Sequence, residues 1–176
     1  MVYNMSELFA ADGTATEMEV RPEFKTFDLE ELSYPLSGDN VMKLYLTHTG
    51  GRRVRVRGEG KVRLIMPCDR CMKDVPVDVP VDFEREIDAN VTEQERIDDL
   101  DEQPYIDGYT LDLDGLVRNE LILNLPMKVL CKKNCKGICP KCGQDLNEGE
   151  CGCDKVGLDP RMAVILDLFQ GRGEDQ

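Results

Sequence analysis

Residues 41–66 read VMKLYLTHTGGRRVRVRGEGKVRLIM, and this stretch decides the fold class. From Arg53 to Arg57, arginines alternate with valines, so the apolar side chains lie on one face of a strand and the charged ones on the other. Gly50-Gly51 separates this run from the apolar run before it and suits a turn that needs positive φ. The stretch therefore predicts an antiparallel β-hairpin.

Further strands extend this hairpin along the chain. Gly58-Glu59-Gly60 predicts a bend, and the run from Lys61 to Met66 predicts another strand. Residues 75–84 alternate again, but they include two prolines. Proline has no backbone N–H to donate to a neighbouring strand, so it is disfavoured in a strand paired on both sides. This strand is therefore expected at an edge of the sheet.

Two helices are predicted after the strands. The first begins near Asp112 or Asp114 and stops before Pro126. The second covers residues 160–169, opened by Asp159-Pro160 as N-cap and first helical residue. The predicted fold class is α+β: an antiparallel β-sheet, as hairpin or meander, with two helices and a cysteine-rich, zinc-stapled C-terminal segment.

The chain is expected to have three regions. Residues 1–23 are a polar N-terminal segment for which poor order is expected. Residues 24–125 form a β-rich core, with an acidic, mobile excursion near 90–108 and a helix near 112–125. Residues 126–170 hold the zinc-binding segment and the C-terminal helix.

Composition restricts the cellular setting. The chain has 176 residues, 41% of them hydrophobic, which is enough for one core plus a small appendage. Apolar runs are too short to span a bilayer, and the N-terminal sequence lacks the features of a secretory signal. We therefore expect a cytoplasmic protein without membrane contact, whose reduced thiols bind metal and do not form a disulfide framework.

Eight cysteines fall into four close pairs, which carry the clearest chemistry of the chain. A structural zinc site takes four thiolates at a tetrahedral centre, and two short-spaced pairs supply one such site. Four pairs therefore predict two structural zinc ions with no cysteine left over. Histidine does not take part in this scheme, because the one histidine, His48, is interpreted as a surface residue near the hairpin turn.

The stronger predicted site is a zinc-ribbon-like knuckle, formed by Cys139, Cys142, Cys151 and Cys153. Its C-P-K-C-G motif lets backbone amides point at the sulfurs, and the glycine can take a positive φ. The second site collects the other four cysteines: Cys68, Cys71, Cys131 and Cys135. It ties a strand end to the segment after the first helix, about 60 residues away, where loop closure costs most. Other pairings of the pairs remain open.

Other cysteine chemistries are weighed against structural zinc. A thioredoxin-like redox pair at Cys139 and Cys142 lacks a surrounding βαβ pattern and leaves three pairs unexplained. Iron–sulfur ligation remains open, because cysteine alone does not choose the metal. Catalytic zinc is disfavoured, since four thiolates leave no open coordination position.

The chain is strongly acidic overall, but its charge is distributed unevenly along the sequence. The formal net charge is −13, and residues 82–114 hold thirteen acids against two arginines. Two basic stretches, 52–63 and 128–141, stand out from this background. Their candidate RNA-phosphate contacts are Arg53, Arg55, Arg57, Arg63, Lys132 and Lys136. The alternative for the arginines is an ordinary solvated face that pairs with the acidic segment. Neither stretch holds an aromatic residue for base stacking.

Enzyme signals are absent from the sequence. It contains no P-loop and no G-x-S-x-G motif, and its acidic residues form a run with no recognisable convergent pair. We expect no catalytic residues and no small-molecule substrate.

Several motifs together resemble the YceD-like family of bacterial large ribosomal RNA subunit accumulation proteins. They are MPCDRC, LDLDGLVRNELILNLPMKVLC, CKGICPKCGQDLN, CGC and DPRMAVILDL, between about Leu64 and Leu168. The resemblance implies a cytoplasmic protein needed for accumulation of 23S rRNA and for biogenesis of the large ribosomal subunit. Because some members lack most of these cysteines, it also implies that metal supports the fold.

Three hypotheses follow for the mode of action. The first is a non-enzymatic, zinc-stapled factor that contacts rRNA through the basic stretches. The second is an acidic interaction module whose residues 82–114 engage a basic ribosomal or processing protein. The third is a thiol redox sensor, which requires metal-free Cys139 and Cys142.

Overall fold

The computed structural model describes residues 1–91 and 105–153. The chain forms two compact units, Met1–Lys133 and Asn134–Gln176, the second described as far as residue 153. Within the described part of the chain, no helix has the length and apolar character needed to cross a membrane.

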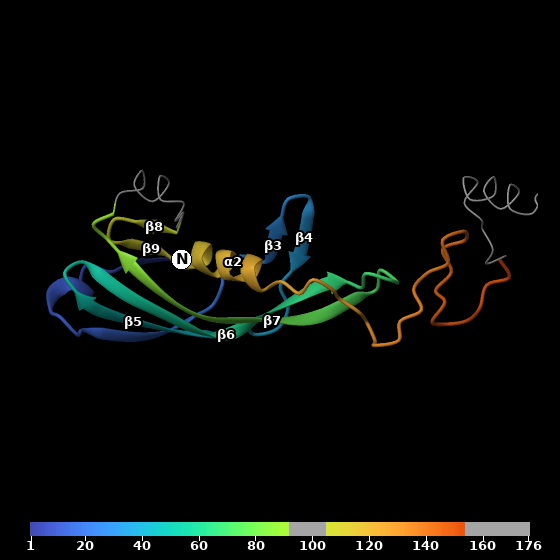
Figure 1. Ribbon diagram of the computed structural model, residues 1–176, viewed down its shortest axis with the longest axis horizontal. Helices are drawn as coiled ribbons and strands as arrows, with labels where there is room; N and C mark the ends of the chain where they lie inside the picture. Colours follow the sequence, from blue (N-terminus) through green and yellow to red (C-terminus); the bar gives the residue numbers. More distant parts are fainter. Residues whose placement is uncertain (92–104, 154–176) are drawn as a thin grey trace, which may run out of the picture. The chain divides into compact units, whose positions relative to one another are not determined.

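A four-stranded antiparallel sheet forms the framework of the first unit (Figure 1). Its order is β2-β5-β6-β7, with bounds Ala15–Val20, Met42–Gly50, Arg53–Pro67 and Asp74–Asp88. Gly50 and Gly51 connect β5 to β6 with φ values of 112° and 64°, a conformation that residues with a Cβ rarely adopt. The predicted hairpin is confirmed.

Strand β7 lies at an edge of this sheet, as its prolines predict. It pairs with β6 along 15 residues, from Arg53 opposite Asp88 to Pro67 opposite Asp74. This long hairpin carries the first cysteine pair in the loop at its tip.

The predicted bend at residues 58–60 is wrong, because β6 runs through them without a break. Gly58 lies opposite Phe83, and a Cβ on Gly58 would sit 2.3 Å from the Phe83 ring. A Cβ on Gly60 would sit 2.8 Å from the Met42 side chain. These glycines make room for large side chains of the neighbouring strands and do not turn the chain.

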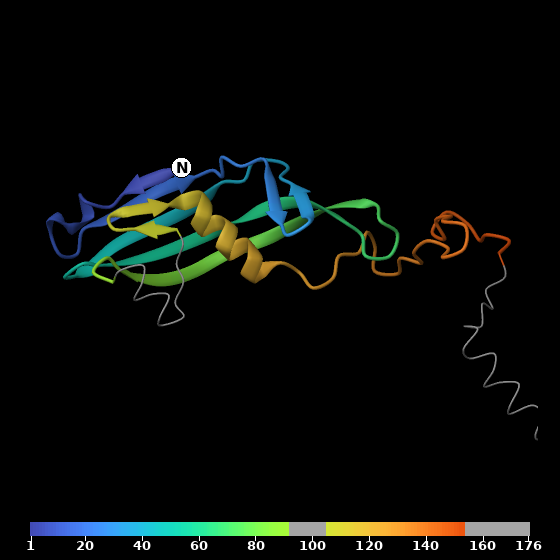
Figure 2. The same ribbon diagram turned by 90° about the horizontal axis from the view of Figure 1, so that it is seen from above.

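One face of the sheet is buried and the other is open. Alternate residues of β5, β6 and β7, such as Leu44, Val56 and Val79, are fully buried. Helix α2 (Leu113–Asn124) and two small sheets lie on this side (Figures 1 and 2). The small sheets are β1-β9-β8, with bounds Val2–Asn4, Thr110–Asp112 and Ile106–Asp107, and β3-β4, with bounds Thr26–Leu29 and Leu32–Pro35.

Helix α2 begins and ends where the sequence predicts. Asp112 is its N-cap, and the Asp112 Oδ1 accepts a hydrogen bond of 3.1 Å from the Asp114 backbone N–H. Glu120 of α2 is 1% exposed, and its Oε1 lies 3.1 Å from a guanidinium nitrogen of Arg85 on β7. Burial raises the pKa of the Glu120 carboxyl, while Arg85 opposes this rise.

The prediction of two helices is wrong for the residues that the structure describes. They contain one α-helix, α2, and a single 3₁₀ turn, η1 (Leu8–Ala10). Two small sheets, which the sequence does not predict, accompany α2 on the buried face. The other predicted helix, at 160–169, lies outside the described residues, as does the stretch 92–104 of the predicted acidic excursion.

Residues 134–153 of the second unit are organised by turns. Their one ladder contact is an isolated antiparallel bridge between Ile138 and Asp145. Leu146 N–H donates to the Gly137 carbonyl at 2.9 Å, which closes the loop beside this bridge. This small loop carries Cys139 and Cys142, and Cys151 and Cys153 follow it along the chain.

Candidate metal centres and the charged sheet face

The tip of the β6–β7 hairpin presents two cysteines from one tight loop. Cys68 N–H donates to the Lys73 carbonyl at 2.8 Å, and Met72 N–H donates to the Cys68 carbonyl at 2.9 Å. Met72 takes a φ of 61°, which completes the reversal. The loop buries both thiols, since Cys68 is 0% exposed and Cys71 is 6% exposed.

The segment after α2 is attached to this tip by two hydrogen bonds. Asp69 N–H donates to the Val129 carbonyl at 2.9 Å, and Val129 N–H donates to Asp69 Oδ2 at 2.7 Å. This attachment brings the Cys131 Sγ to 3.5 Å from the Cys71 Sγ, across 60 residues of sequence. Three thiols of the first unit therefore meet at the hairpin tip.

Cys135 completes this group, in which all four sulfur atoms lie within 4.8 Å of one another. The Asn147 Nδ2 donates to the Cys135 Sγ at 3.3 Å, which orients that sulfur. We call Cys68, Cys71, Cys131 and Cys135 the hairpin-tip group. These are the four cysteines that the sequence assigns to the second metal site.

Backbone amides favour a thiolate in the hairpin-tip group. Burial by itself raises the pKa of Cys68, but backbone N–H groups, that of Cys131 foremost, outweigh it and lower the pKa to about 6. Metal binding requires the thiolate, so this environment prepares the sulfur as a ligand.

The second set of four, Cys139, Cys142, Cys151 and Cys153, also has its sulfurs within 4.8 Å of one another. We call it the knuckle group. Gly143 N–H donates to the Cys139 carbonyl, and Cys139 N–H donates to the Gln144 carbonyl, both at 2.8 Å. Gly143 has a φ of 75°, as the C-P-K-C-G motif predicts.

The thiols of the knuckle group compete for protons. Backbone N–H groups of Cys142 and Lys141 lower the pKa of Cys139 to about 6. The hydrogen bond with the Cys142 sulfur raises the pKa of Cys153 to about 12. Four sulfurs this close can all lose their protons only when a cation offsets their charge, which a bound metal does.

The donor chemistry of both groups is uniform. Each is made of four sulfurs, and the described residues place no carboxylate or histidine in either group. The two cysteine tetrads are thus positioned to hold metal ions. Four thiolates would fill a tetrahedral shell and leave no open position for a substrate.

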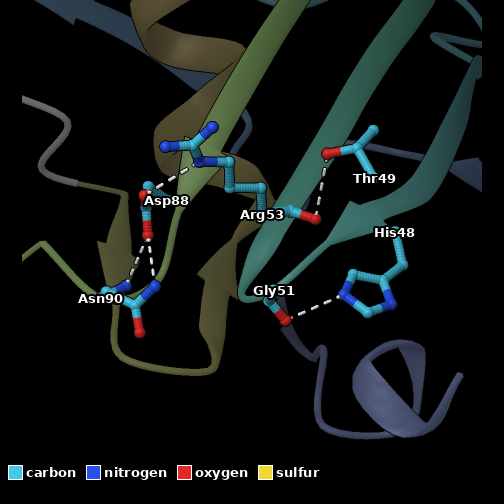
Figure 3. A network of polar contacts seen from close by, with 6 residues as sticks. All are labelled: His48, Thr49, Gly51, Arg53, Asp88 and Asn90. Atoms are coloured by element: carbon cyan, nitrogen blue, oxygen red, sulfur yellow. Dashed lines mark hydrogen bonds and ion pairs between the residues drawn. The ribbon is translucent and has the colours of Figure 1, made fainter. Parts of the chain in front are cut away.

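His48 is not the surface residue that the sequence suggests. It is 3% exposed, and its Nδ1 lies 2.9 Å from the Ala11 carbonyl. Its Nε2 lies 3.0 Å from the Gly51 carbonyl (Figure 3). These hydrogen bonds, that of Ala11 first, raise the pKa of the imidazole. His48 stands on the buried face of β5, where alternation places every second residue, and it fixes the hairpin turn.

The candidate RNA-binding arginines lie on the open face of the sheet, each beside a carboxylate. Arg53 Nε is 3.2 Å from Asp88 (Figure 3), Arg55 Nε is 3.4 Å from Glu84, and Arg63 Nε is 2.5 Å from Asp78. Arg57 is paired with Glu59. Arg63, and then Lys61, hold the pKa of the Asp78 carboxyl well below its usual range.

The sequence offered pairing with the acidic segment as an alternative but did not identify the partners. Asp78, Glu84 and Asp88 stand on the neighbouring strand β7, and Glu59 stands on β6 itself. On the open face, β6 and β7 together carry five basic and seven acidic side chains, a balance of −2. The two candidate lysines, Lys132 and Lys136, are exposed. RNA contact by these six residues stays a prediction.

Two bacterial proteins are similar to this chain over two thirds of its length. Protein YlbN of Bacillus subtilis is 24% identical over 131 residues, 66% of this chain and 74% of YlbN. Protein Rv2926c of Mycobacterium tuberculosis is 27% identical over 116 residues, 66% of this chain and 56% of Rv2926c. Both are named as uncharacterized proteins, and the chain spans just over half of the mycobacterial relative. No solved structure matches.

A family model for the large ribosomal RNA subunit accumulation protein YceD matches residues 56–169. The match covers both cysteine groups and α2. It implies a role in accumulation of large-subunit ribosomal RNA. The chain belongs to the YceD family.

Proposed function

We propose that the chain is a non-enzymatic, zinc-stapled cytoplasmic factor that supports accumulation of 23S rRNA during biogenesis of the large ribosomal subunit. The two complete sets of four thiols, within a region matched by the YceD family, carry this proposal. A shell of four thiolates suits a structural ion and leaves no position for catalysis.

Zinc fits these sites better than iron on chemical grounds. Both metals accept four thiolates, but zinc has no redox chemistry. Its d-electrons impose no geometry of their own, so the four thiolates can set the tetrahedral shell. Its role here is to close the hairpin tip and the knuckle. In such a site the free energy of metal binding also stabilises the folded state.

The route of action is contact with rRNA or with ribosomal proteins. RNA contact is supported by the exposed arginines of β6, whose ion pairs are of the solvent-exposed kind that contributes little and can be exchanged. A basic ribosomal or processing protein is the second candidate partner. The balance of −2 on the open face favours that alternative.

Elemental analysis of the chain, purified without added metal or tag, tests the metal part. We expect two zinc ions per chain. One zinc ion per chain would mean that only one of the two cysteine groups binds metal. A folded protein without metal would overturn the proposal in favour of thiol redox sensing. Iron in place of zinc would contradict the purely structural role.

A cellular measurement tests the rRNA part. In cells whose own copy of the gene is deleted, the wild-type chain should restore the ratio of 23S to 16S rRNA. The double variant Cys68→Ser/Cys71→Ser should fail to restore it, whereas the matched surface variant Arg21→Gln should succeed. Deleting residues 93–102 distinguishes the two candidate partners. If the deletion abolishes binding of ribosomal proteins but leaves RNA binding intact, the acidic interaction module is favoured.

A further inference from the structure

Tyr45 occupies the middle of the open sheet face, next to arginines of the neighbouring strand β6. The register places Tyr45 of β5 opposite Arg57 of β6, and Thr47 opposite Arg55. A groove on this face is lined by Tyr45, Thr47, Arg55, Arg57, Glu59 and Glu84. The aromatic residue that both basic stretches lack is thus supplied by the neighbouring strand.

We propose that this groove is a binding site for single-stranded RNA, with one base stacked on the Tyr45 ring and the adjacent phosphates held by Arg55 and Arg57. The inference rests on the proposed function and names its RNA contact.

The chemistry of the groove suits an unpaired base. Tyr45 is half-buried, so its ring is supported by the sheet while part of it remains accessible. A base stacked on an aromatic ring gains free energy without regard to its identity. Arg55 and Arg57 project on the same face as the ring, and guanidinium groups bind phosphate with paired hydrogen bonds.

Local charge does not oppose this ligand. The charged side chains that line the groove are Arg55 and Arg57 on one side of the balance and Glu59 and Glu84 on the other, so the charge of the lining is zero. The pairs are exposed: the side chains of Arg55 and Glu84 are 53% and 58% accessible. A phosphate can therefore replace a carboxylate as the partner of each arginine at small cost.

Strands position these groups more rigidly than loops do. Tyr45 and the arginines belong to adjacent strands whose pairing is continuous from Met42 to His48. The spacing between ring and guanidinium groups is thus fixed by the ladder. We expect weak, sequence-tolerant binding dominated by stacking.

The test is fluorescence anisotropy of the full-length, metal-loaded chain with labelled hexauridylate and hexa-adenylate. Tyr45→Ala should weaken binding about fivefold or more, since a stacked base is typically worth 1–3 kcal/mol on truncation. Tyr45→Phe should bind like the wild type, because it keeps the ring. Two phosphate contacts predict a logarithmic salt slope of about −1.4.

Arg57→Gln should make this slope shallower, while Arg21→Gln, an exposed arginine outside the groove, should not. Thermal melting and metal content serve as checks that each variant is folded.

Several outcomes would overturn the inference. Equal binding by Tyr45→Ala and the wild type is one, and equally tight binding of an RNA duplex is another, since a duplex offers no free base. Binding of an oligolysine peptide in place of RNA would identify a basic protein as the ligand. If Tyr45→Ala binds RNA normally and still restores 23S rRNA in cells, the groove is excluded while the proposed function stands.

Discussion

The hairpin-tip group and the knuckle group contain the same donors but are built in opposite ways. The hairpin-tip group draws Cys71 and Cys131 from segments 60 residues apart, joined by the hydrogen bonds between Asp69 and Val129. The knuckle group spans 15 residues, Cys139 to Cys153, and is shaped by its own backbone turns.

This difference teaches how metal and fold depend on each other. Bringing distant segments together costs loop-closure entropy, so the hairpin-tip group needs the sheet and α2 in place first. The knuckle needs only local turns. Metal at the hairpin tip should therefore stabilise the whole first unit, while metal in the knuckle should order its own loop.

Loss of the hairpin-tip cysteines should have the largest effect. In Cys68→Ser/Cys71→Ser, we expect the first unit to lose about 4 kcal/mol of unfolding free energy, the stabilisation given by free metal at a thousand times its dissociation constant. Urea unfolding and a count of bound metal measure this. Unchanged stability together with unchanged metal content would contradict a site at the hairpin tip.

The second largest effect should come from a substitution that disturbs the sheet, which should affect the first unit but not metal binding by the knuckle group. Gly58→Ala places a Cβ at 2.3 Å from the Phe83 ring, so overpacking should cost about 1–3 kcal/mol of stability. Thermal melting of the first unit measures this cost. The knuckle should keep its metal in the same protein, and its loss would mean that the knuckle depends on the sheet. Gly149→Ala, whose Cβ meets no atom closer than 3.9 Å, is the control.

The attachment of the segment after α2 can be broken without removing a ligand. Asp69→Ala deletes the acceptor of the half-buried Val129 N–H bond, which should cost about 1 kcal/mol. Hydrogen exchange at the Val129 amide should speed up, and the hairpin-tip group should bind metal less tightly. Asp74→Ala, on the exposed strand end nearby, should leave both measurements unchanged.

His48 gives the first unit a pH dependence of its own. Its pKa is raised above the ordinary 6.5 by the carbonyls of Ala11 and then Gly51, with Asp12 nearby. The stabilisation is complete below the unfolded-state pKa and is lost as the pH rises through the higher folded-state pKa. Melting of the wild type from pH 6 to 9 should show this decline, and His48→Gln should abolish it. If His48→Gln shows the same decline in stability, another titrating side chain causes the decline.

The smallest effect on the first unit should come from the knuckle. Cys142→Ser should leave the stability of the sheet within about 0.5 kcal/mol, the range of surface substitutions. It should still remove one metal ion and increase hydrogen exchange in residues 134–153. A large loss of sheet stability would show that the two groups do not act separately.

Local features of the fold could be predicted from sequence. The Gly50-Gly51 hairpin, the Asp112 N-cap and the edge position of β7 all depend on residues within a few positions of one another. The glycines at 58 and 60 misled the prediction because their partners, Phe83 and Met42, stand on other strands. A glycine that admits a neighbour's side chain has the same sequence signature as a glycine that turns the chain.

The sequence by itself determined the cysteine pairs, the geometry of the C-P-K-C-G turn and the alternation of β6, because short spacings leave the backbone few alternatives. Tertiary structure alone decided that Cys71 meets Cys131, that the β6 arginines face the acids of β7, and that His48 is buried. These contacts depend on strand register and on closing long loops. Register and closure are set by packing of the entire core, which no local pattern contains.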